Sequence, residues 1–494
     1  MYGPRAAGVG AAVPRGPSAA RGRHLRGGGP PYGSQLRHRE PGQAFPGVRG
    51  GRISARAAAP GAHPRCPEPG LTRTWGRGKV GFVRRSLLYR GKEVKSKAAP
   101  PWQRLPAGLR DWTPEELAAL RAVEGCLRRT FEAWGYREVA TPALEYLETW
   151  TRGIGSRPAA ALFVVVDRTG ELLALRPEMT VPVARFVATR WPDTVARLYY
   201  VGSVFRGELG RGNSREFPQA GVERVGDGGA DADAEVVALA VDALRQAAVP
   251  GVRVGLGHAG FLRALLDASG LEEDRQVAQE ALYRRDFVTL SSLLDGAPAP
   301  VRGALLDLPS LRGPGALQRA RGLGVGKEAL DELEAVLEAV QGYAVADAVE
   351  VDLGIIRDFD YYTGMVLEAY APGSGAPLLG GGRYDQLLER FGAPRPAVGF
   401  AVHLERVLAT SQRGGVLAPV LEVGYERPAR AQALAWVLRA RAAGLRVAAT
   451  PTQEGRLQPG LSFRADGVWW VERDGSRRPL APQDLDALLE GRTP

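Results

Sequence analysis

The pattern of apolar and polar positions predicts that the folded part of the chain begins near Leu105 and opens with a helix. Residues 113–116 form a capping box with proline at the first helical position. Apolar side chains then recur on one helical face until Gly135 ends the helix. Residues 137–147 have the composition of a strand, and Pro142 restricts that strand to a sheet edge or an interface.

The middle of the chain has the pattern of paired strands that alternate with helices. Two short apolar runs flank Thr169 and Gly170, as in a hairpin, and two longer runs flank a polar, glycine-rich loop over 208–214. The two longer runs are expected to form an antiparallel pair. The predicted strands are 162–167, 172–175, 197–207, 215–225 and 252–256, and the predicted helices are 176–189, 233–247 and one from Gly260.

In the last part of the chain, the pattern of apolar positions predicts a helical insertion, further strands and a separate small unit. Residues 270–348 have the pattern of several short helices, of which 327–340 is the clearest. The later strands are 349–356, 365–370 and one that ends at Val402, and they are followed by a helix from His403; the final unit has a helix over 429–443 and strands over 445–449 and 467–472. We therefore expect an α+β fold in which helices flank an antiparallel sheet, with a helical insertion and a small C-terminal α/β domain.

Positive charge is concentrated at the start of the chain. Residues 1–100 hold 20 Lys and Arg against 3 Asp and Glu, and the other 394 residues hold 45 against 51. The folded body is therefore mildly acidic, which disfavours a nucleic-acid-binding surface on it. The segment 1–104 is rich in Gly, Pro and Arg, and we expect this basic tail to be disordered. Because no methionine occurs between Met1 and Met179, one interpretation is that the tail is not translated.

Cysteine usage and hydropathy indicate a cytoplasmic protein in a reducing compartment. Cys66 and Cys126 form neither a metal-binding spacing nor a convincing disulfide pair. The tail lacks the apolar core of a secretory signal, and no apolar run approaches the length of a membrane span. His258 and His403 are the only histidines of the folded part, so no metal site is expected. We expect His258 to be structural.

The candidate chemistry begins at the segment 356–364, between two apolar strands. Arg357, Tyr361 and Tyr362 are expected at a strand end, where they would suit a small, charged, aromatic ligand. The alternative is that Arg357 pairs with Asp360 while the tyrosines pack in a core. The glycines of 380–382, just before Arg383 and Tyr384, would either let the backbone approach a nucleotide or mark a turn.

Further polar residues lie on the neighbouring predicted strands. Gln219 and Glu223 are four residues apart and so face the same side of a sheet. Together with Glu178, Glu223 would be costly to bury unless an ammonium or imidazole group met it, whereas Arg206 and Arg406 suit carboxylate or phosphate groups. The alternatives are that Glu178 only favours a helix N-terminus, that Arg206 pairs with Glu223 across strands, and that Arg406 is exposed.

In order along the chain, these segments resemble the core of class II histidyl-tRNA synthetase. The matching motifs are 175–178, 204–208 with 215–219, 357–362, 381–385 and 398–406, within residues 105–412. The resemblance implies a class II aminoacyl-tRNA-synthetase-like sheet. It also implies a histidine pocket made by Glu178, Thr180, Arg206, Gln219, Glu223, Arg357, Tyr361, Tyr362 and Tyr384, and a vestigial ATP site at Arg206, Phe217 and Arg406.

Departures from the synthetase pattern resemble a paralogous branch, the regulatory subunits of ATP phosphoribosyltransferase (HisZ type). Met179, Pro218 and Asp358 replace residues that lie beside substrate in the synthetase. The resemblance implies a non-catalytic subunit that binds a short-form catalytic subunit as a hetero-oligomer, with a hetero-octamer expected. It also implies that L-histidine is the effector and that neither a cofactor nor a catalytic residue is present.

The C-terminal segment 413–494 resembles a shortened anticodon-binding domain. Residues 415–494 hold 11 Lys and Arg against 9 Asp and Glu, which gives little electrostatic attraction for tRNA. A vestigial or protein-contact role is therefore expected. Two alternatives stay open from sequence: an active histidine–tRNA ligase, because the ligand positions are chemically filled, and an RNA-binding protein that uses its basic tail.

Overall fold

The computed structural model describes most of the chain beyond the predicted tail. The described residues are 101–154, 162–191, 193–207, 214–357, 361–412, 420–452, 459–472 and 474–490. The predicted disordered tail lies outside them, except for its last four residues. Asp358, Asp360 and most of the loop 208–214 also lie outside them.

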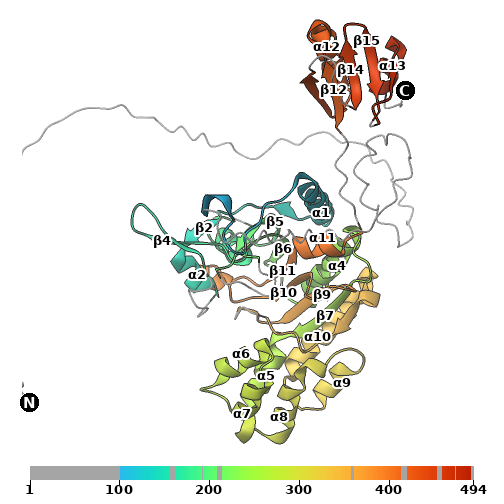
Figure 1. The fold of residues 1–494 in the computed structure, drawn as a ribbon. Coiled ribbons are helices and arrows are strands. Elements are labelled where there is room, and N and C mark those ends of the chain that lie inside the picture. The colour runs from blue at the N-terminus through green and yellow to red at the C-terminus, as the bar shows by residue number, and fades with distance from the viewer. Residues whose placement is uncertain are drawn as a thin grey trace, which may run out of the picture. The chain divides into compact units, whose positions relative to one another are not determined.

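A mixed eight-stranded sheet forms the centre of the part that carries the site (Figure 1). Its inner strands are antiparallel to one another, whereas β1 and β8 join the sheet edges in parallel. In spatial order the strands are β1 (Arg137–Glu138), β5 (Ala196–Phe205), β6 (Glu216–Val225), β11 (Ala397–His403), β10 (Leu379–Arg383), β9 (Met365–Tyr370), β7 (Arg253–His258) and β8 (Val349–Val351). The predicted antiparallel pair is confirmed as β5 and β6.

Three helices cover one face of this sheet: α1 (Pro114–Ala133), α4 (Ala230–Gln246) and α11 (Leu404–Thr410). The predicted capping box of α1 is confirmed, because the Thr113 side chain accepts from the Glu116 N–H and the Glu116 carboxylate accepts from the Thr113 N–H. Beneath the helix, the ring of Phe131 lies 5.7 Å from Tyr199 and 6.1 Å from Phe400, centroid to centroid. The rings of Phe131, Tyr199 and Phe400 thus pack together in the core beneath α1.

A smaller sheet and two helices contribute to a second core on the opposite face of the central sheet. They are β2 (Leu144–Tyr146), β3 (Val164–Val166), β4 (Leu172–Leu175), α2 (Leu147–Ile154) and α3 (Thr180–Arg190). The hairpin prediction is confirmed as β3 and β4. The prediction of one strand over 137–147 is wrong: the chain leaves the central sheet after β1, passes Pro142, and pairs β2 with β4 in a different sheet.

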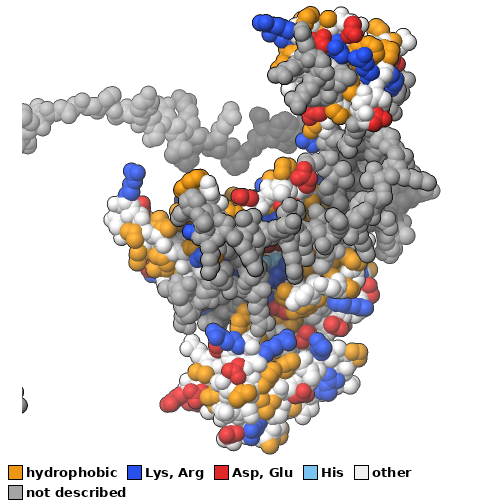
Figure 2. Space-filling model, in the orientation of Figure 1, with side chains coloured by type: hydrophobic (Ala, Val, Ile, Leu, Met, Phe, Trp, Pro, Cys, Tyr) orange, Lys and Arg blue, Asp and Glu red, His pale blue; other side chains and the backbone are white. Residues whose placement is uncertain are grey.

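Residues 259–340 form six α-helices, of which the first is the predicted helix from Gly260 and the other five lie in the predicted run of short helices over 270–348. They are α5 (Ala259–Ala268), α6 (Arg275–Arg284), α7 (Phe287–Leu293), α8 (Ala299–Leu306), α9 (Ala316–Arg321) and α10 (Lys327–Val340). His258 is structural, as expected, because its Nδ1 accepts from the Gly260 N–H at 3.1 Å and so caps α5. Figure 2 shows basic and acidic side chains interspersed over these helices, so this face presents no continuous basic stripe.

The C-terminal unit has its own five-stranded sheet and its own core. The spatial order is β13 (Val447–Pro451), β12 (Leu421–Tyr425), β14 (Gly460–Arg464), β15 (Gly467–Val471) and β16 (Arg477–Pro479), with helices α12 (Arg430–Ala442) and α13 (Pro482–Leu489). The rings of Trp436 and Phe463 meet in the core at 6.2 Å. The predicted α+β fold with a C-terminal α/β unit is thus confirmed. No helix in the described segments is long and apolar enough to cross a bilayer.

Candidate functional site

The floor of the candidate site is a face of the central sheet that is rich in glycine. The strand register places Glu223 opposite Gly399, Gly399 opposite Gly382, and Gly380 opposite Glu368. Residues directly opposite one another in a sheet share a face, so two carboxylates lie among glycines over the middle strands. The missing side chains leave space above the sheet that other residues would fill.

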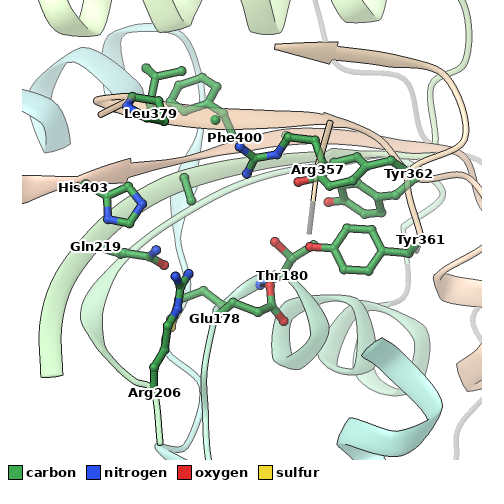
Figure 3. A pocket seen from close by; sticks show the side chains of 16 residues that line it. Glu178, Thr180, Arg206, Gln219, Arg357, Tyr361, Tyr362, Leu379, Phe400 and His403 are labelled. Atoms are coloured by element: carbon green, nitrogen blue, oxygen red, sulfur yellow. Dashed lines mark hydrogen bonds between the residues drawn. The ribbon is translucent and has the colours of Figure 1, made fainter. Parts of the chain in front are cut away.

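A cavity of about 50 Å³ lies on this floor. A single water needs about 10–15 Å³ of such space, so the cavity accommodates a small molecule. Figure 3 shows Glu178, Gln219 and Arg357 around the space, with Tyr361 and Tyr362 along one side. The lining residues are Glu178, Met179, Thr180, Arg206, Gln219, Arg357, Tyr361, Tyr362, Pro377, Leu379, Gly380, Tyr384, Gly399, Phe400, Ala401 and His403.

The structure therefore brings together the residues that the sequence predicted for a histidine pocket. Eight of the nine line the cavity. The ninth, Glu223, lies against the wall, because its Oε2 accepts a hydrogen bond from the Tyr384 hydroxyl. Of the predicted ATP-site residues, Arg206 lines the cavity, and Arg206 also lies over the Phe217 ring. Arg406 is outside the lining.

The Arg357 guanidinium lies directly over the glycine strand β10. Its Nη1 donates to Glu368 Oε1 at 2.8 Å, and a Cβ on Gly380 would overlap the guanidinium. The interpretation of the three glycines as a turn is wrong, because they form the middle of a strand, in which Gly380 allows the close approach of the guanidinium. Asp360, the alternative partner of Arg357, lies outside the described residues. Glu368 was missed, although a carboxylate within the apolar strand β9 was a visible signal.

Three tyrosines form an aromatic wall. The ring centroids of Tyr361 and Tyr362 are 4.8 Å apart, and those of Tyr361 and Tyr384 are 5.7 Å apart. The Arg357 guanidinium lies 5.8 Å from the Tyr362 centroid. All three tyrosines are buried, and burial raises the pKa of each hydroxyl. The wall stays uncharged, so it suits a flat, polar, aromatic ligand.

Two buried carboxylates give the site its acidic character. Burial raises the pKa of Glu223 to about 8, although the hydrogen bond from Tyr384 opposes the shift. Burial also raises the pKa of Glu178, whose oxygens accept from the backbone N–H groups of Thr180 at 2.7 Å and Val181 at 2.8 Å. Glu178 thus occupies the N-terminus of α3 and lines the cavity at the same time. Both alternatives for this residue hold.

Several buried polar atoms around the cavity have no hydrogen-bond partner within the described parts of the chain. They include Glu223 Oε1, Gln219 Oε1 and the Tyr200 hydroxyl. An unsatisfied buried group is costly, and each such group calls for a water or a ligand. Tyr200 was missed because its position in an apolar strand is typical of a core residue. The pair of acceptors on β6 indicates that the ligand is a hydrogen-bond donor.

The residues predicted for the ATP site make contacts with other parts of the chain. The imidazole of His403 stacks on the Phe217 ring, with centroids 5.3 Å apart and planes inclined by 24°. Burial lowers the pKa of His403 well below its usual value, and the Arg406 charge adds to the shift. Arg406 donates to the Pro377 carbonyl at 2.7 Å and is partly buried. The alternative that Arg406 is simply exposed is therefore wrong.

The structure excludes the alternative cross-strand pair and locates two of the three departures from the synthetase pattern. A cross-strand pair of Arg206 with Glu223 is wrong, because the register puts Glu223 opposite Leu198. Met179 is buried and lines the cavity, so it occupies space there. Pro218 lies on β6 beside Phe217, and Asp358 lies outside the described residues. Two of the three departures are thus at or next to the site.

We expect the replacement Glu223→Gln to stabilise the chain increasingly as the pH rises. The folded-state pKa of this carboxyl is about 8, whereas an unperturbed Glu titrates near about 4.3. The folded state holds the proton more tightly, so the unmodified chain loses stability between these two pH values, and glutamine has no proton to lose. The difference in Tm between variant and parent should grow from about pH 5 to about pH 8 and then level off.

Thermal unfolding across this pH range measures the effect. Glu216→Gln is the matched control, because Glu216 lies on the same strand but is exposed. A difference in Tm for Glu223→Gln that stays constant with pH would contradict a buried, proton-holding carboxyl.

Comparison with known proteins identifies the family. The sequence model of the histidyl-tRNA synthetase family matches residues 108–407. An ATP phosphoribosyltransferase regulatory subunit of Symbiobacterium thermophilum is 44% identical over 69% of this chain and 90% of its own length. A protein of the same name from Moorella thermoacetica is 44% identical over 65% of this chain and 85% of its own length. Both relatives align along most of their length.

Solved structures agree in fold. A structure described as an ATP phosphoribosyltransferase regulatory subunit/histidyl-tRNA synthetase from Bacillus halodurans has a TM-score of 0.66 and 32% identity, and the match covers 73% of this chain and 96% of that chain. Histidyl-tRNA synthetase from Nostoc sp. PCC 7120 has a TM-score of 0.64 at 21% identity, covering 78% of this chain and 98% of that chain, and thus shares the fold. The predicted class II synthetase-like architecture is confirmed. The chain belongs to the family of ATP phosphoribosyltransferase regulatory subunits, the non-catalytic relatives of histidyl-tRNA synthetase.

Proposed function

We propose that this chain regulates a separate, short-form catalytic subunit of ATP phosphoribosyltransferase, and that free L-histidine bound in the cavity signals feedback inhibition. The assignment of histidine as the effector rests on the buried carboxylate of Glu223, which accepts a hydrogen bond from Tyr384 above the glycine-rich strands and lies beside two further tyrosines. Buried carboxylates need a cationic or hydrogen-bond-donating partner. An imidazole with an ammonium group supplies both kinds of donor.

Three parts of the ligand find partners of matching chemistry. The imidazole lies between the tyrosines and donates to Glu223. The ammonium group lies near Glu178 and Gln219, both of which are buried acceptors on the cavity wall. The ligand carboxylate lies near Arg357, whose guanidinium offers a planar pair of donors. This arrangement uses two of the atoms that find no partner within the described residues, Glu223 Oε1 and Gln219 Oε1.

The opposite end of the cavity supports a sensing role without activation of the amino acid. An ATP-dependent ligase must hold a nucleotide beside the amino acid. Here His403 covers part of Phe217, and Arg406 is engaged with the Pro377 carbonyl. Met179 further reduces the free volume. The cavity is thus suited to the amino acid alone.

Histidine affinity should show a maximum between about pH 6.5 and about pH 8. The imidazole of free histidine titrates near about 6.5, and the pKa of Glu223 is about 8. Between these pH values the free imidazole is neutral and the Glu223 carboxyl of the empty site is protonated. Together they already hold the one proton that the imidazole and Glu223 share in the complex. Below this pH range the imidazole must lose a proton on binding, and above it Glu223 must regain one. The affinity therefore falls on both the acid limb and the alkaline limb of the pH profile. Isothermal titration of the purified chain across this range measures the profile.

Glu223→Gln is the matched variant for this pH profile. It should lose the alkaline limb and keep the acid limb, because only the ligand still titrates. An affinity that rises steadily through pH 8 in the parent chain would place the ammonium group at Glu223 and would contradict the proposed orientation.

Assembly with the catalytic subunit is expected to produce a hetero-octamer. Size-exclusion chromatography with light scattering of the co-expressed subunits gives the mass directly, and four copies of each subunit are expected. A mass that corresponds to one copy of each subunit would contradict this stoichiometry. The same preparation, assayed for transferase activity with and without histidine, tests the regulatory role, since an unchanged rate would overturn it.

The C-terminal unit fits a protein-contact role better than tRNA binding. Three of its arginines are engaged within the unit: Arg439 pairs with Asp486 at 2.7 Å, Arg464 pairs with Glu426 at 2.9 Å, and Arg477 lies over Trp469. Phosphate contacts depend on basic side chains that can reach the backbone of the nucleic acid. We therefore propose that tRNA is not a ligand of this unit.

A further inference from the structure

A second and larger cavity lies next to the proposed histidine site. Its volume is about 160 Å³, and it is enclosed by α5, α6, the segment that follows β8, and β9. The lining residues are Ala259, Leu262, Arg263, Leu266, Arg275, Gln276, Gln279, Ile355, Ile356, Arg357, Tyr362 and Val366. Neither the sequence motifs nor the proposed function assigns a role to this cavity.

The lining combines an aliphatic floor with a basic rim. The floor consists of six small or branched apolar side chains, and the rim consists of arginines and glutamines. No Asp or Glu is among the lining residues. Apolar walls with a few converging polar groups are typical of small-molecule sites. The sign of the rim indicates that the ligand carries negative charge.

The arginines of the rim are not equivalent. Arg275 is paired with Asp267, and Arg357 with Glu368. Arg263 instead donates to two neutral backbone carbonyls, Tyr362 O at 2.9 Å and Thr363 O at 2.6 Å. Burial lowers the pKa of Arg263 and the nearby Arg275 charge lowers it further, whereas the Asp267 carboxylate opposes the shift. A bound anion would reduce the repulsion between these two guanidinium groups.

The two cavities share a wall. Arg357 and Tyr362 line both of them. The Arg263 guanidinium also holds the backbone carbonyl of Tyr362. A ligand that shifts Arg263 or Arg357 therefore changes the position of two side chains proposed to contact histidine.

We propose that the second cavity binds a small carboxylate with an apolar body, and that this ligand and histidine change each other's affinity through Arg357 and Tyr362. The binding of the carboxylate stands on the second cavity alone, whereas the coupling rests on the proposed histidine site. Because coupling between two sites is reciprocal, the same factor must appear in both titrations.

The chain offers separate reporters for the two cavities. It contains four isoleucines, at positions 53, 154, 355 and 356, and three methionines, at positions 1, 179 and 365. Ile355 and Ile356 line the second cavity, and Met179 lines the first. Selective labelling of the isoleucine δ1 and methionine ε methyl groups thus gives a simple NMR spectrum in which each cavity has its own signals. Ile154, in α2, is an internal reference.

The probe is hexanoate, with acetate and hexanol as controls. Hexanoate should shift the Ile355 and Ile356 signals in a saturable way and leave Ile154 unchanged. Acetate lacks the apolar body and hexanol lacks the charge, so each should bind at least about tenfold more weakly than hexanoate, a difference of about 1.4 kcal/mol. If hexanol bound as well as hexanoate, or if hexanoate gave no saturable shift at Ile355 and Ile356, the proposal would be overturned.

Two pairs of variants confine the effect to the cavity. Gln276→Glu and Arg275→Glu place negative charge on the rim and should each weaken hexanoate at least about tenfold. Gln318→Glu, in α9, and Arg284→Glu, in α6, make the same changes outside the lining and should leave hexanoate binding unchanged. Equal effects of rim and control variants would show non-specific electrostatics and would contradict the proposal.

The coupling is tested in the same samples. Histidine should shift Met179, and its affinity should change by the same factor by which histidine changes that of hexanoate. If histidine fails to shift Met179 while hexanoate still shifts the isoleucines, the histidine site fails and the second site stands. If both ligands bind without affecting each other, the shared-wall mechanism is overturned.

Discussion

Histidine affinity should fall by at least about 30-fold when Glu223 is replaced by glutamine, because truncation of a buried, hydrogen-bonded charge partner costs about 2–5 kcal/mol. Glu223 is almost completely buried and is held by Tyr384. Glutamine has a similar shape but cannot carry the negative charge that an imidazolium requires. Isothermal titration of the purified variant measures the loss.

The regulated complex gives a second measurement of the same change. With Glu223→Gln, the transferase complex should keep its activity in the absence of histidine and should need at least about 30-fold more histidine for half-inhibition. Glu216→Gln, an exposed carboxylate on the same strand, should behave like the parent chain. Unchanged inhibition in the Glu223 variant would contradict the assignment of the effector to this cavity.

Gly380→Ala should reduce histidine affinity by roughly 10- to 100-fold, since charge-assisted hydrogen bonds contribute about 1.5–3 kcal/mol. The three atoms nearest to the added methyl group all belong to the Arg357 guanidinium. Arg357 is the flexible end of a long side chain, so the fold can be kept while the guanidinium leaves its place beside Glu368. The variant thus displaces one ligand-binding group without removing it.

Gly375→Ala is the matched control for this substitution. A methyl group at Gly375 meets nothing within 4 Å, and its backbone does not have the positive φ that favours glycine. Circular dichroism should show the same fold for both variants, and titration should separate them. If Gly380→Ala bound histidine as tightly as Gly375→Ala, Arg357 would not contact the ligand carboxylate.

The sequence predicted local elements well where a single rule determines them. The capping box at residues 113–116 and the amphipathic pattern of α10 were confirmed with their boundaries. The start of α3 was placed too early, at Arg176 instead of Thr180, because the Glu178 carboxylate binds the first free N–H groups and defines the helix end. Such a contact depends on side-chain geometry that periodicity does not contain.

Residues whose roles depend on distant partners were harder to predict. Glycines are depleted in strands, so 380–382 suggested a turn. The glycine strand is explained only by its neighbours in the fold, because added side chains would meet Arg357 at Gly380, Phe400 at Gly381 and Tyr362 at Gly382. His403 carried no motif signal of its own, and its stacking on Phe217 follows from the register of β6 and β11. The predicted site residues came from ordered motifs, which record chemistry but not the contacts between their members.

The cavity is built from residues that are far apart in sequence, so it exists only in the folded chain. Tyr384 and Glu223 are separated by 161 positions and meet only after β6, β10 and β11 have paired. A partly folded chain therefore has no histidine site, and any ligand that binds the cavity favours the complete fold. At a concentration 100 times its Kd, such a ligand adds about 2.7 kcal/mol to the free energy of unfolding. Abundant histidine would thus protect the inhibited subunit from proteolysis. The amount of the subunit would therefore be maintained until the histidine concentration falls.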